Sequence, residues 1–181
     1  MKKSIFTIVA LIAMAFATFA QKQVSQKTHI KFFSTTPIED IEANNYASTG
    51  VVNTETGNIV FSVPMQSFEF EKSLMQKHFN SKKFLHTKAN PKAKLVGKIT
   101  DLSAVNFSKD GDYTVDVKGD LTINGVTNPI NEKVNIAITN GKMSLNSTFN
   151  VTLADYDIVF KRGKPSKNIA KTVEVTVVAE Y

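Results

Sequence analysis

Apolar and polar residues alternate with a period of two along most of the second half of the chain. Between residues 113 and 123 every second position is apolar or glycine, and the positions between them are polar or charged. The same alternation recurs over residues 134–139, 142–153 and 172–180. Because successive side chains of a β-strand point to opposite sides, this period predicts strands with one buried and one solvated face.

The first half of the chain contains further strand signals with weaker alternation. Residues 28–34, 38–53, 58–70 and 92–99 each predict a strand, although the alternation over 38–53 is poor. Glycine-containing turns separate many of the strands. These turns lie at Gly57, Gly111, Gly125 and Gly141. Residues 126–139 are expected to pair with residues 113–123 and form one further strand. This gives eight predicted strands.

One short helix interrupts this series after the third strand. Residues 71–79 place Leu74, Met75, His78 and Phe79 on one face at helical spacing. Glu71 would lie in the first turn, where the helix dipole favours an acidic side chain. A packed or capping residue is the favoured interpretation of His78, ahead of a ligand role.

Eight antiparallel strands with one apolar face each must roll up or stack to bury that face. The strands are long, which favours an eight-stranded, lipocalin-like barrel over a sandwich. A barrel of this size is either filled by side chains or holds one slender ligand, and the pattern alone favours the filled interior. The small inward residues Gly97, Gly119 and Ser147 either relieve curvature or leave a lumen.

Residues 119–130 predict a β-hairpin. Asn124-Gly125 tolerates the positive φ angles that a two-residue hairpin turn requires. Pro129 lacks an amide donor, so we expect it at a bulge or at the edge of a barrel rim and not inside a continuous ladder.

Residues 1–20 have the features of a secretory signal peptide. Lys2 and Lys3 form a short basic region, and residues 5–19 are apolar apart from threonines. We expect cleavage after Ala20, with Ala17 as the alternative, leaving residues 21–181 as one domain in the periplasm or outside the cell. A retained anchor is less favoured because the apolar run is shorter than the roughly 20 residues of a spanning helix.

Composition excludes several classes of function. The chain has no cysteine, so disulfides and a thiolate nucleophile are absent. Without Lys2 and Lys3 it has 20 basic and 16 acidic residues, a net charge of +4. This mild charge gives no indication of nucleic acid as a partner.

The sequence also lacks a recognisable catalytic or metal-binding pattern. His29, His78 and His86 do not have the spacing of metal ligands. Asp155 and Asp157 form no acid/base pair by their spacing alone. We therefore expect no enzyme activity, no cofactor and no metal.

The hairpin sequence Gly-Asp-Leu-Thr-Ile-Asn-Gly-Val-Thr-Asn-Pro at residues 119–129 closely resembles a motif of the YceI-like proteins, the lipocalin-like polyisoprenoid-binding family. Residues 74–80, 95–99 and 149–156 are similar to other parts of that family. One departure is that many members carry an Arg-x-Asp-His-Leu pattern in the helix region, where this chain has Leu-Met-Gln-Lys-His-Phe. No role of that Arg or Asp carries over.

The resemblance implies a barrel whose apolar interior holds a polyisoprenoid or a similar, fatty-acid-like lipid. It is compatible with a homodimer and with peripheral contact with a membrane. It also reverses the preference for a filled interior. The residues expected to line the lumen are Phe61, Phe68, Leu74, Met75, Phe79, Leu95, Ile99, Val115, Val117, Leu121, Phe149, Val151 and Val175.

A phosphate headgroup would suit the lysine-rich segments, and we expect it near Lys94, Arg162 and Lys164. Arg162 is the only arginine of the chain, and a guanidinium is well shaped for bidentate phosphate contacts. For any individual lysine a solvated surface is the favoured alternative. The sequence thus leaves three hypotheses in this order: a lipid carrier, a filled barrel that acts as a structural or interaction module, and an enzyme acting on a bound lipid.

Overall fold

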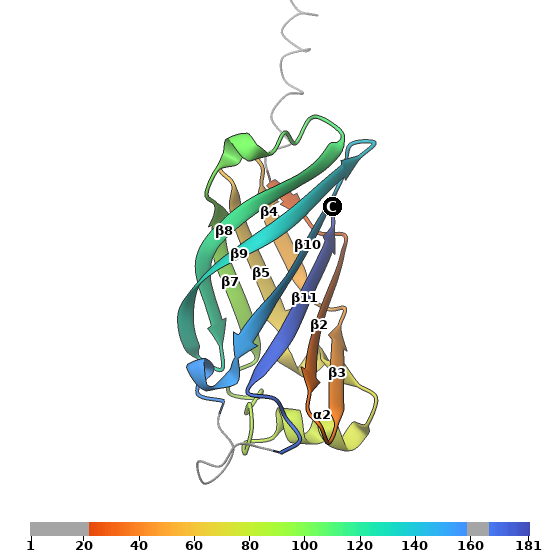
Figure 1. Ribbon diagram of the computed structural model, residues 1–181, viewed down its shortest axis with the longest axis vertical. Coiled ribbons are helices and arrows are strands. Elements are labelled where there is room, and N and C mark those ends of the chain that lie inside the picture. Colours follow the sequence, from red (N-terminus) through yellow and green to blue (C-terminus); the bar gives the residue numbers. More distant parts are fainter. Residues whose placement is uncertain (1–21, 159–166) are drawn as a thin grey trace, which may run out of the picture.

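A computed structural model describes residues 22–158 and 167–181 of the chain. Within these residues, eleven strands form one antiparallel sheet in the order β1-β4-β5-β7-β8-β9-β10-β11-β2-β3-β6 (Figure 1). The strands are β1 (Lys22–Val24), β2 (Lys27–Thr35), β3 (Asp40–Asn45), β4 (Thr49–Asn53), β5 (Asn58–Pro64), β6 (Glu69–Phe70), β7 (Lys92–Ile99), β8 (Gly111–Ile123), β9 (Val126–Thr139), β10 (Lys142–Thr152) and β11 (Thr172–Glu180). The predicted all-β class is confirmed. Residues 1–20, the predicted signal peptide, lie outside the described residues.

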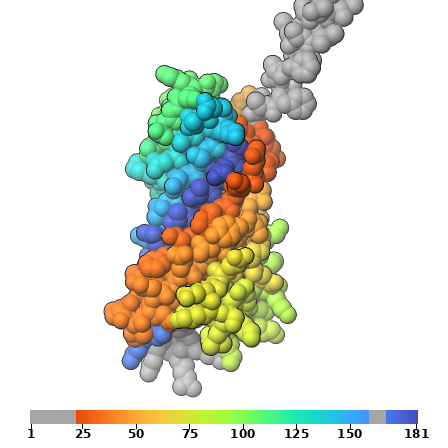
Figure 2. Space-filling model, turned by 90° about the vertical axis from the view of Figure 1, so that its right-hand side faces the viewer, coloured from red at the N-terminus to blue at the C-terminus, as the bar shows by residue number. Residues whose placement is uncertain are grey.

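The sheet curls so that two consecutive strands, β1 and β2, pair with strands from different parts of it. β1 pairs with β4, whereas β2, only two residues further along, pairs with β11. Between them the amide of Ser25 donates to the carbonyl of Gly50 (2.8 Å) and that of Gln26 to Glu180 (2.7 Å). Figure 2 shows β2 against β11 on this face. The fold is therefore a barrel-like curled sheet with an enclosed interior.

Eleven strands replace the eight that the sequence predicted. The predicted strand over residues 38–53 is divided into β3 and β4, and that over 58–70 into β5 and the two-residue β6, while β1 is additional. Asn45 sits at the division with its side chain fully buried. Its Nδ2 donates to the Pro64 carbonyl (2.8 Å), and its Oδ1 accepts from the Ala47 amide (3.0 Å) and the Ser48 hydroxyl (2.9 Å). These side-chain bonds take the place of strand pairing where the chain bends.

The helix is present but differs in position from its prediction. Helix α2 (Ser73–Asn80) follows the sixth strand and not the third, because of the strands added above. Lys72 is its N-cap, so Glu71 lies outside the first turn and the expected dipole contact is absent. Short 3-10 helices are η2 (Met65–Ser67), η3 (Leu102–Ala104) and η4 (Leu153–Tyr156). Among the described residues, no helix combines the length and the apolar composition needed to cross a membrane.

The predicted hairpin at Asn124-Gly125 is confirmed. Asn124 and Gly125 have φ angles of 53° and 80°, and they join β8 to β9, whose pairing extends from Gly111–Ile138 to Ile123–Val126. Positive φ at both central residues matches the twist of the flanking strands. Pro129 lies opposite Asp120 inside the continuous β8–β9 register, so the expected bulge is absent. On its other side no strand pairs with it, which is compatible with its missing amide.

A close approach between β7 and β8 explains the glycines of their inward faces. Gly97 and Gly119 are paired across the two strands. A Cβ atom at Gly119 would lie 2.5 Å from the Cα of Gly97 and closer still to the carbonyl oxygen of Val96. Neither glycine lines the cavity described below, so the pair permits curvature and leaves no lumen.

Candidate functional site

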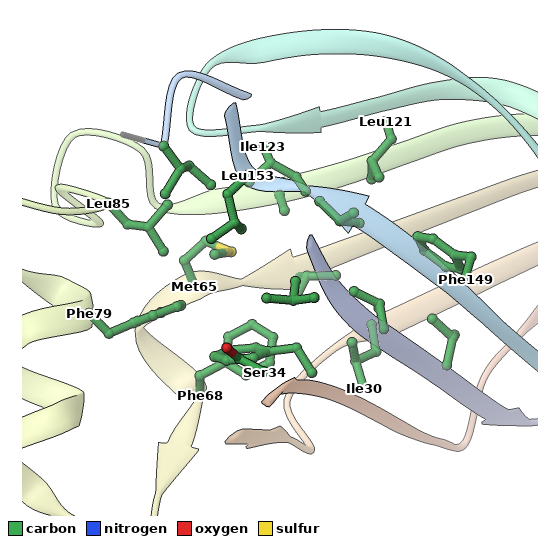
Figure 3. Close-up of a pocket in the computed structure, with 18 of the residues that line it drawn as sticks. Ile30, Ser34, Met65, Phe68, Phe79, Leu85, Leu121, Ile123, Phe149 and Leu153 are labelled. Atoms are coloured by element: carbon green, nitrogen blue, oxygen red, sulfur yellow. The ribbon is translucent and has the colours of Figure 1, made fainter. Parts of the chain in front are cut away.

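The curled sheet encloses a cavity of about 640 Å³. This volume is within the range of roughly 300–1,000 Å³ that is usual for small-molecule sites. Among the described residues 38 line it, of which 29 are apolar, and seven of these are phenylalanines. Figure 3 shows Ile30, Leu121 and Phe149 from three strands directed toward the same space as Phe79 of α2. Side chains alone do not fill the interior, contrary to what the alternation pattern by itself favoured.

Helix α2 lies at one end of the curled sheet (Figure 1), where a cluster of five phenylalanines that line the cavity holds it. Phe79 of α2 stacks on Phe32 of β2, with ring centroids 5.7 Å apart and planes inclined by 18°. Its ring also lies 5.7 Å from Phe68, 5.1 Å from Phe70 and 6.3 Å from Phe84. Aromatic pairs of this kind contribute about 0.5–1.5 kcal/mol beyond the area they bury. The cavity is therefore covered by apolar packing at the α2 end.

Most polar residues of the lining already have partners. The Ser34 hydroxyl accepts a hydrogen bond from the Ala170 amide (2.9 Å), and the Ser147 hydroxyl donates to the Lys133 carbonyl (2.7 Å). Glu39 accepts from Asn168 (3.1 Å) and forms an ion pair with Lys72 (3.1 Å). These two contacts, with that of Asn168 the larger, hold the pKa of the Glu39 carboxyl below its ordinary value.

Glu132 of β9 has no such partner. It lines the cavity between the inward-facing Ile130 and Val134, and its side chain is half-buried. It forms no hydrogen bond or ion pair with any residue that the structure describes. Burial in this apolar wall raises the pKa of the Glu132 carboxyl. An otherwise apolar site thus contains one carboxyl group without a partner in the described chain.

Ten of the thirteen predicted lumen residues line the cavity, and three do not. The ten are Phe61, Phe68, Met75, Phe79, Leu95, Val117, Leu121, Phe149, Val151 and Val175. Leu74 is 62% exposed, because α2 packs through the edge formed by Met75 and Phe79. Ile99 and Val115 face inward but are buried in the core outside the cavity. Contact of the ten residues with a ligand stays a prediction.

The predicted headgroup residues are not brought together. Lys94 borders the cavity, but its side chain is exposed, because its neighbours Ala93 and Leu95 take the inward positions of β7. Arg162 and Lys164 lie outside the described residues. Three other polar residues that the structure describes also border the cavity. They come from α2 and the loop after it, and are His78, Ser81 and Lys83.

Sequence reasoning missed part of the lining. Phe32, Phe70 and Phe84 belong to segments whose alternation is weak, so only their aromatic character could have singled them out. Glu132 had a clear signal, because it shares the parity of Ile130 and Val134 on β9. Carboxyl groups rarely occupy an inward position on an apolar strand face, so one found there points to a special role.

The described residues offer no assembled metal centre. Residues 22–158 and 167–181 contain no group of three or more His, Cys, Asp or Glu side chains that could hold a metal ion. His29 stacks on Tyr46 with centroids 4.6 Å apart and hydrogen-bonds Asn44 (2.7 Å) on the outside of the sheet. The cavity lining, by contrast, is mostly apolar.

Comparison with known proteins agrees with this geometry. The YceI-like domain matches residues 18–181. The chain belongs to the YceI-like family. The resemblance that residues 119–129 carried is thereby confirmed. Comparison of this YceI-like chain with curated protein sequences finds no match.

Solved structures share the fold of this YceI-like protein at low sequence identity. BcnA of Burkholderia cenocepacia is 14% identical, with a TM-score of 0.71 over 85% of this chain and 96% of BcnA. A polyisoprenoid binding domain from Saccharophagus degradans, implicated in plant cell wall breakdown, is 18% identical, with a TM-score of 0.73 over 87% and 96% of the two chains. The Campylobacter jejuni YceI protein is 15% identical, with a TM-score of 0.57 over 76% and 80%.

Proposed function

We propose that this YceI-like protein binds one long-chain lipid, of polyisoprenoid or fatty-acid-like type, inside its cavity. The observation that carries the proposal is the apolar cavity of about 640 Å³, enclosed by the sheet and covered by α2. The shared fold of a polyisoprenoid binding domain from Saccharophagus degradans supports this class of ligand.

Burial of the hydrocarbon chain supplies enough free energy for this function. Each buried methylene contributes about 0.8 kcal/mol, so about a dozen contribute roughly 10 kcal/mol before costs. Loss of translational and rotational freedom offsets about 4 kcal/mol or more of this. Binding in the micromolar range or tighter follows from the apolar wall alone.

The protein would act as a carrier in the periplasm or outside the cell, after removal of residues 1–20. The basic and apolar pattern of those residues supports this location. No observed side-chain arrangement calls for a chemical step on the lipid, so sequestration or transfer is the function that the geometry supports best.

A first test is direct identification of the bound molecule. The protein without residues 1–20 is purified under native conditions, extracted with organic solvent and analysed by mass spectrometry. We expect a long-chain lipid at close to one molecule per chain. Recovery of none, together with failure to take up added geranylgeraniol, would refute lipid binding.

A second test blocks the cavity. Leu121 is buried on the cavity wall, whereas Lys118 is exposed on the other face of the same strand. We predict that Leu121→Trp abolishes lipid uptake, with a loss of stability below about 3 kcal/mol because the larger ring enters open space. Lys118→Trp is the matched control and should bind like the wild type. Uptake is followed by displacement of a fluorescent lipid, and stability by urea unfolding.

A further inference from the structure

The wall of the cavity is split between β9 and β10. The two strands pair only from Lys142–Thr139 to Asn146–Asn135. Beyond that point β9 continues to pair with β8 as far as Val126, and β10 with β11 as far as Thr152, but not with each other. In Figure 1 the two strands run side by side near the top and bow apart below. The unpaired stretch, here called the split, therefore lies between two strands that are each paired on their outer sides.

Hydrogen bonds fix both ends of this split. Where pairing stops, the Ser147 hydroxyl donates to the Lys133 carbonyl (2.7 Å). At the other end, the Asn128 side chain of β9 donates to the carbonyl of Asp155 in η4 (2.6 Å). Pro129, which has no amide to pair, lies on β9 between these two points. The split is thus a built feature of the wall and not a frayed edge.

Glu132 lies on the inner side of this split. It occupies the inward parity of β9 between Ile130 and Val134, while its neighbour Lys133 points outward and forms an ion pair with Asp116 (3.2 Å). Phe149 of β10 is the half-buried lining residue on the opposite strand. The nearest basic residue in sequence is therefore engaged elsewhere, and the carboxyl is left facing the cavity.

A carboxyl in this position discriminates between ligands. A hydrocarbon beside it would displace its remaining water and return no hydrogen bond, which is unfavourable for a polar group. A hydroxyl or an amine at the same place would donate to it, and the amine would add a charge-assisted contact. A phosphate or a second carboxylate would be repelled.

We propose that Glu132 is a polar subsite of the cavity wall and binds the hydrogen-bond donor, a hydroxyl or an amine, of a long-chain lipid whose hydrocarbon part occupies the apolar interior. This inference rests on the proposed lipid binding and specifies the chemistry of the ligand. Because Glu132 is half-buried beside the split, the polar group bound to it would stay at the cavity wall while the chain is buried.

The test compares three ligands with one hydrocarbon skeleton: geranylgeraniol, geranylgeranylamine and the parent hydrocarbon. Dissociation constants are measured by displacement of a fluorescent lipid from the wild type, Glu132→Leu, Glu132→Gln and the control Glu174→Leu, whose carboxyl is exposed on the outside of β11. We expect the wild type to bind the alcohol about tenfold tighter than the hydrocarbon, and the amine tighter still because of its charge-assisted contact.

The variants separate the contributions. Glu132→Leu should lose the preference and bind the hydrocarbon at least as tightly as the wild type does. Glu132→Gln should keep the preference for the alcohol, because an amide oxygen still accepts, and lose the additional preference for the amine. Glu174→Leu should change none of the three constants.

Two results would overturn the subsite. Equal binding of the three ligands by the wild type, or an unchanged preference in Glu132→Leu, removes the role of Glu132 while leaving lipid binding in the cavity intact. If the wild type binds none of the three, the proposed function fails, and the subsite with it.

Discussion

At the scale of single residues, Tyr181 shows how the core tolerates a polar atom. Its hydroxyl is buried without a hydrogen-bond partner among the described residues. It is so close to Gly50 that a Cβ atom there would lie 2.7 Å from it. Burial raises the pKa of this hydroxyl above its ordinary value. The tyrosine ring fills space, and its oxygen contributes nothing that compensates for lost hydration.

We predict that Tyr181→Phe is at least as stable as the wild type at neutral pH, by up to about 1 kcal/mol, because it removes an unpaired buried hydroxyl. The pH dependence gives the sharper result. Below about pH 10 a tyrosine is neutral in both the folded and the unfolded states, so it adds no slope. Above that pH only the unfolded state ionises, and stability falls by about 1.4 kcal/mol per pH unit for the group.

Urea unfolding between pH 9 and 11 measures this slope. It should be shallower in Tyr181→Phe than in the wild type, and unchanged in the control Tyr46→Phe, whose ring is 61% exposed. Identical slopes in all three proteins would mean that Tyr181 ionises as easily in the folded state as in the unfolded state.

The sequence predicted inward residues well where the period of two was strict. Leu121, Phe149 and Val175 line the cavity because strand parity alone decides their direction. Leu74 was misplaced, because a helical stripe does not show which of its edges packs against the sheet. Glu132 was overlooked, because a charged residue is not expected to face inward, although it shares the parity of its inward-facing neighbours.

At the scale of elements, the tip of the β8–β9 hairpin is a junction. The Asn124 side chain accepts from Asn90 in the loop after α2 (2.8 Å) and donates to the carbonyl of Tyr156 in η4 (3.2 Å). The turn therefore holds two other segments near the α2 end of the cavity. The hairpin signal that predicted a local turn contained no sign of these longer contacts.

We predict that Asn124→Gly destabilises the protein by about 1–2 kcal/mol more than Asn140→Gly. Both residues lie in two-residue turns at positive φ, which glycine adopts freely. The effect of the substitution on the backbone is therefore the same at both positions. Only Asn124 joins the neighbouring segments through its side chain. Urea unfolding measures the difference, and equal effects of the two substitutions would exclude the junction. Lipid release should also be faster in Asn124→Gly.

Alternation predicted where strands exist but not where pairing stops. The division between β3 and β4 depends on a buried amide, that of Asn45, whose role appears only when Pro64 is brought beside it. The split between β9 and β10 leaves the alternation of both strands intact, because inward and outward faces persist without a partner. Pro129 was the one local sign of it.

At the scale of the whole molecule, charge is distributed unevenly. Residues 77–98 contain seven lysines and no acidic residue. In the structure this segment includes part of α2 and the loop after it, with Lys83 bordering the cavity. An anionic group at the α2 end of a ligand would therefore meet cations, whereas Glu132 would disfavour one at the split.

We predict that salt weakens binding of geranylgeranyl phosphate more than that of geranylgeraniol. Raising ionic strength from about 0.05 to about 0.5 M shortens the screening length severalfold and should raise the dissociation constant of the phosphate about threefold, with little change for the alcohol. Lys83→Gln should reduce this response, and Lys118→Gln, on the outer face of β8, should not. Equal responses of the two ligands would exclude a cationic headgroup site.

The alternation of apolar and polar residues could not predict the volume of the interior. A filled barrel and a hollow one have the same alternation, because the period reports direction and not the distance between opposite walls. The family resemblance of residues 119–129 supplied the preference for a lumen, and the geometry of β5, β8 and β10 around it gave its volume.

Because the first strands close the sheet by pairing with the last one, the cavity forms late in folding. Ile30 pairs with Val177, 147 positions later, and Gln26 bonds to Glu180. Contacts of such long range form slowly, and the chain exposes its apolar inward faces until they do. During synthesis no segment short of β11 can seal the cavity. Lipid capture is therefore an event of the completed chain, and a nascent chain would need other protection for the same apolar surface.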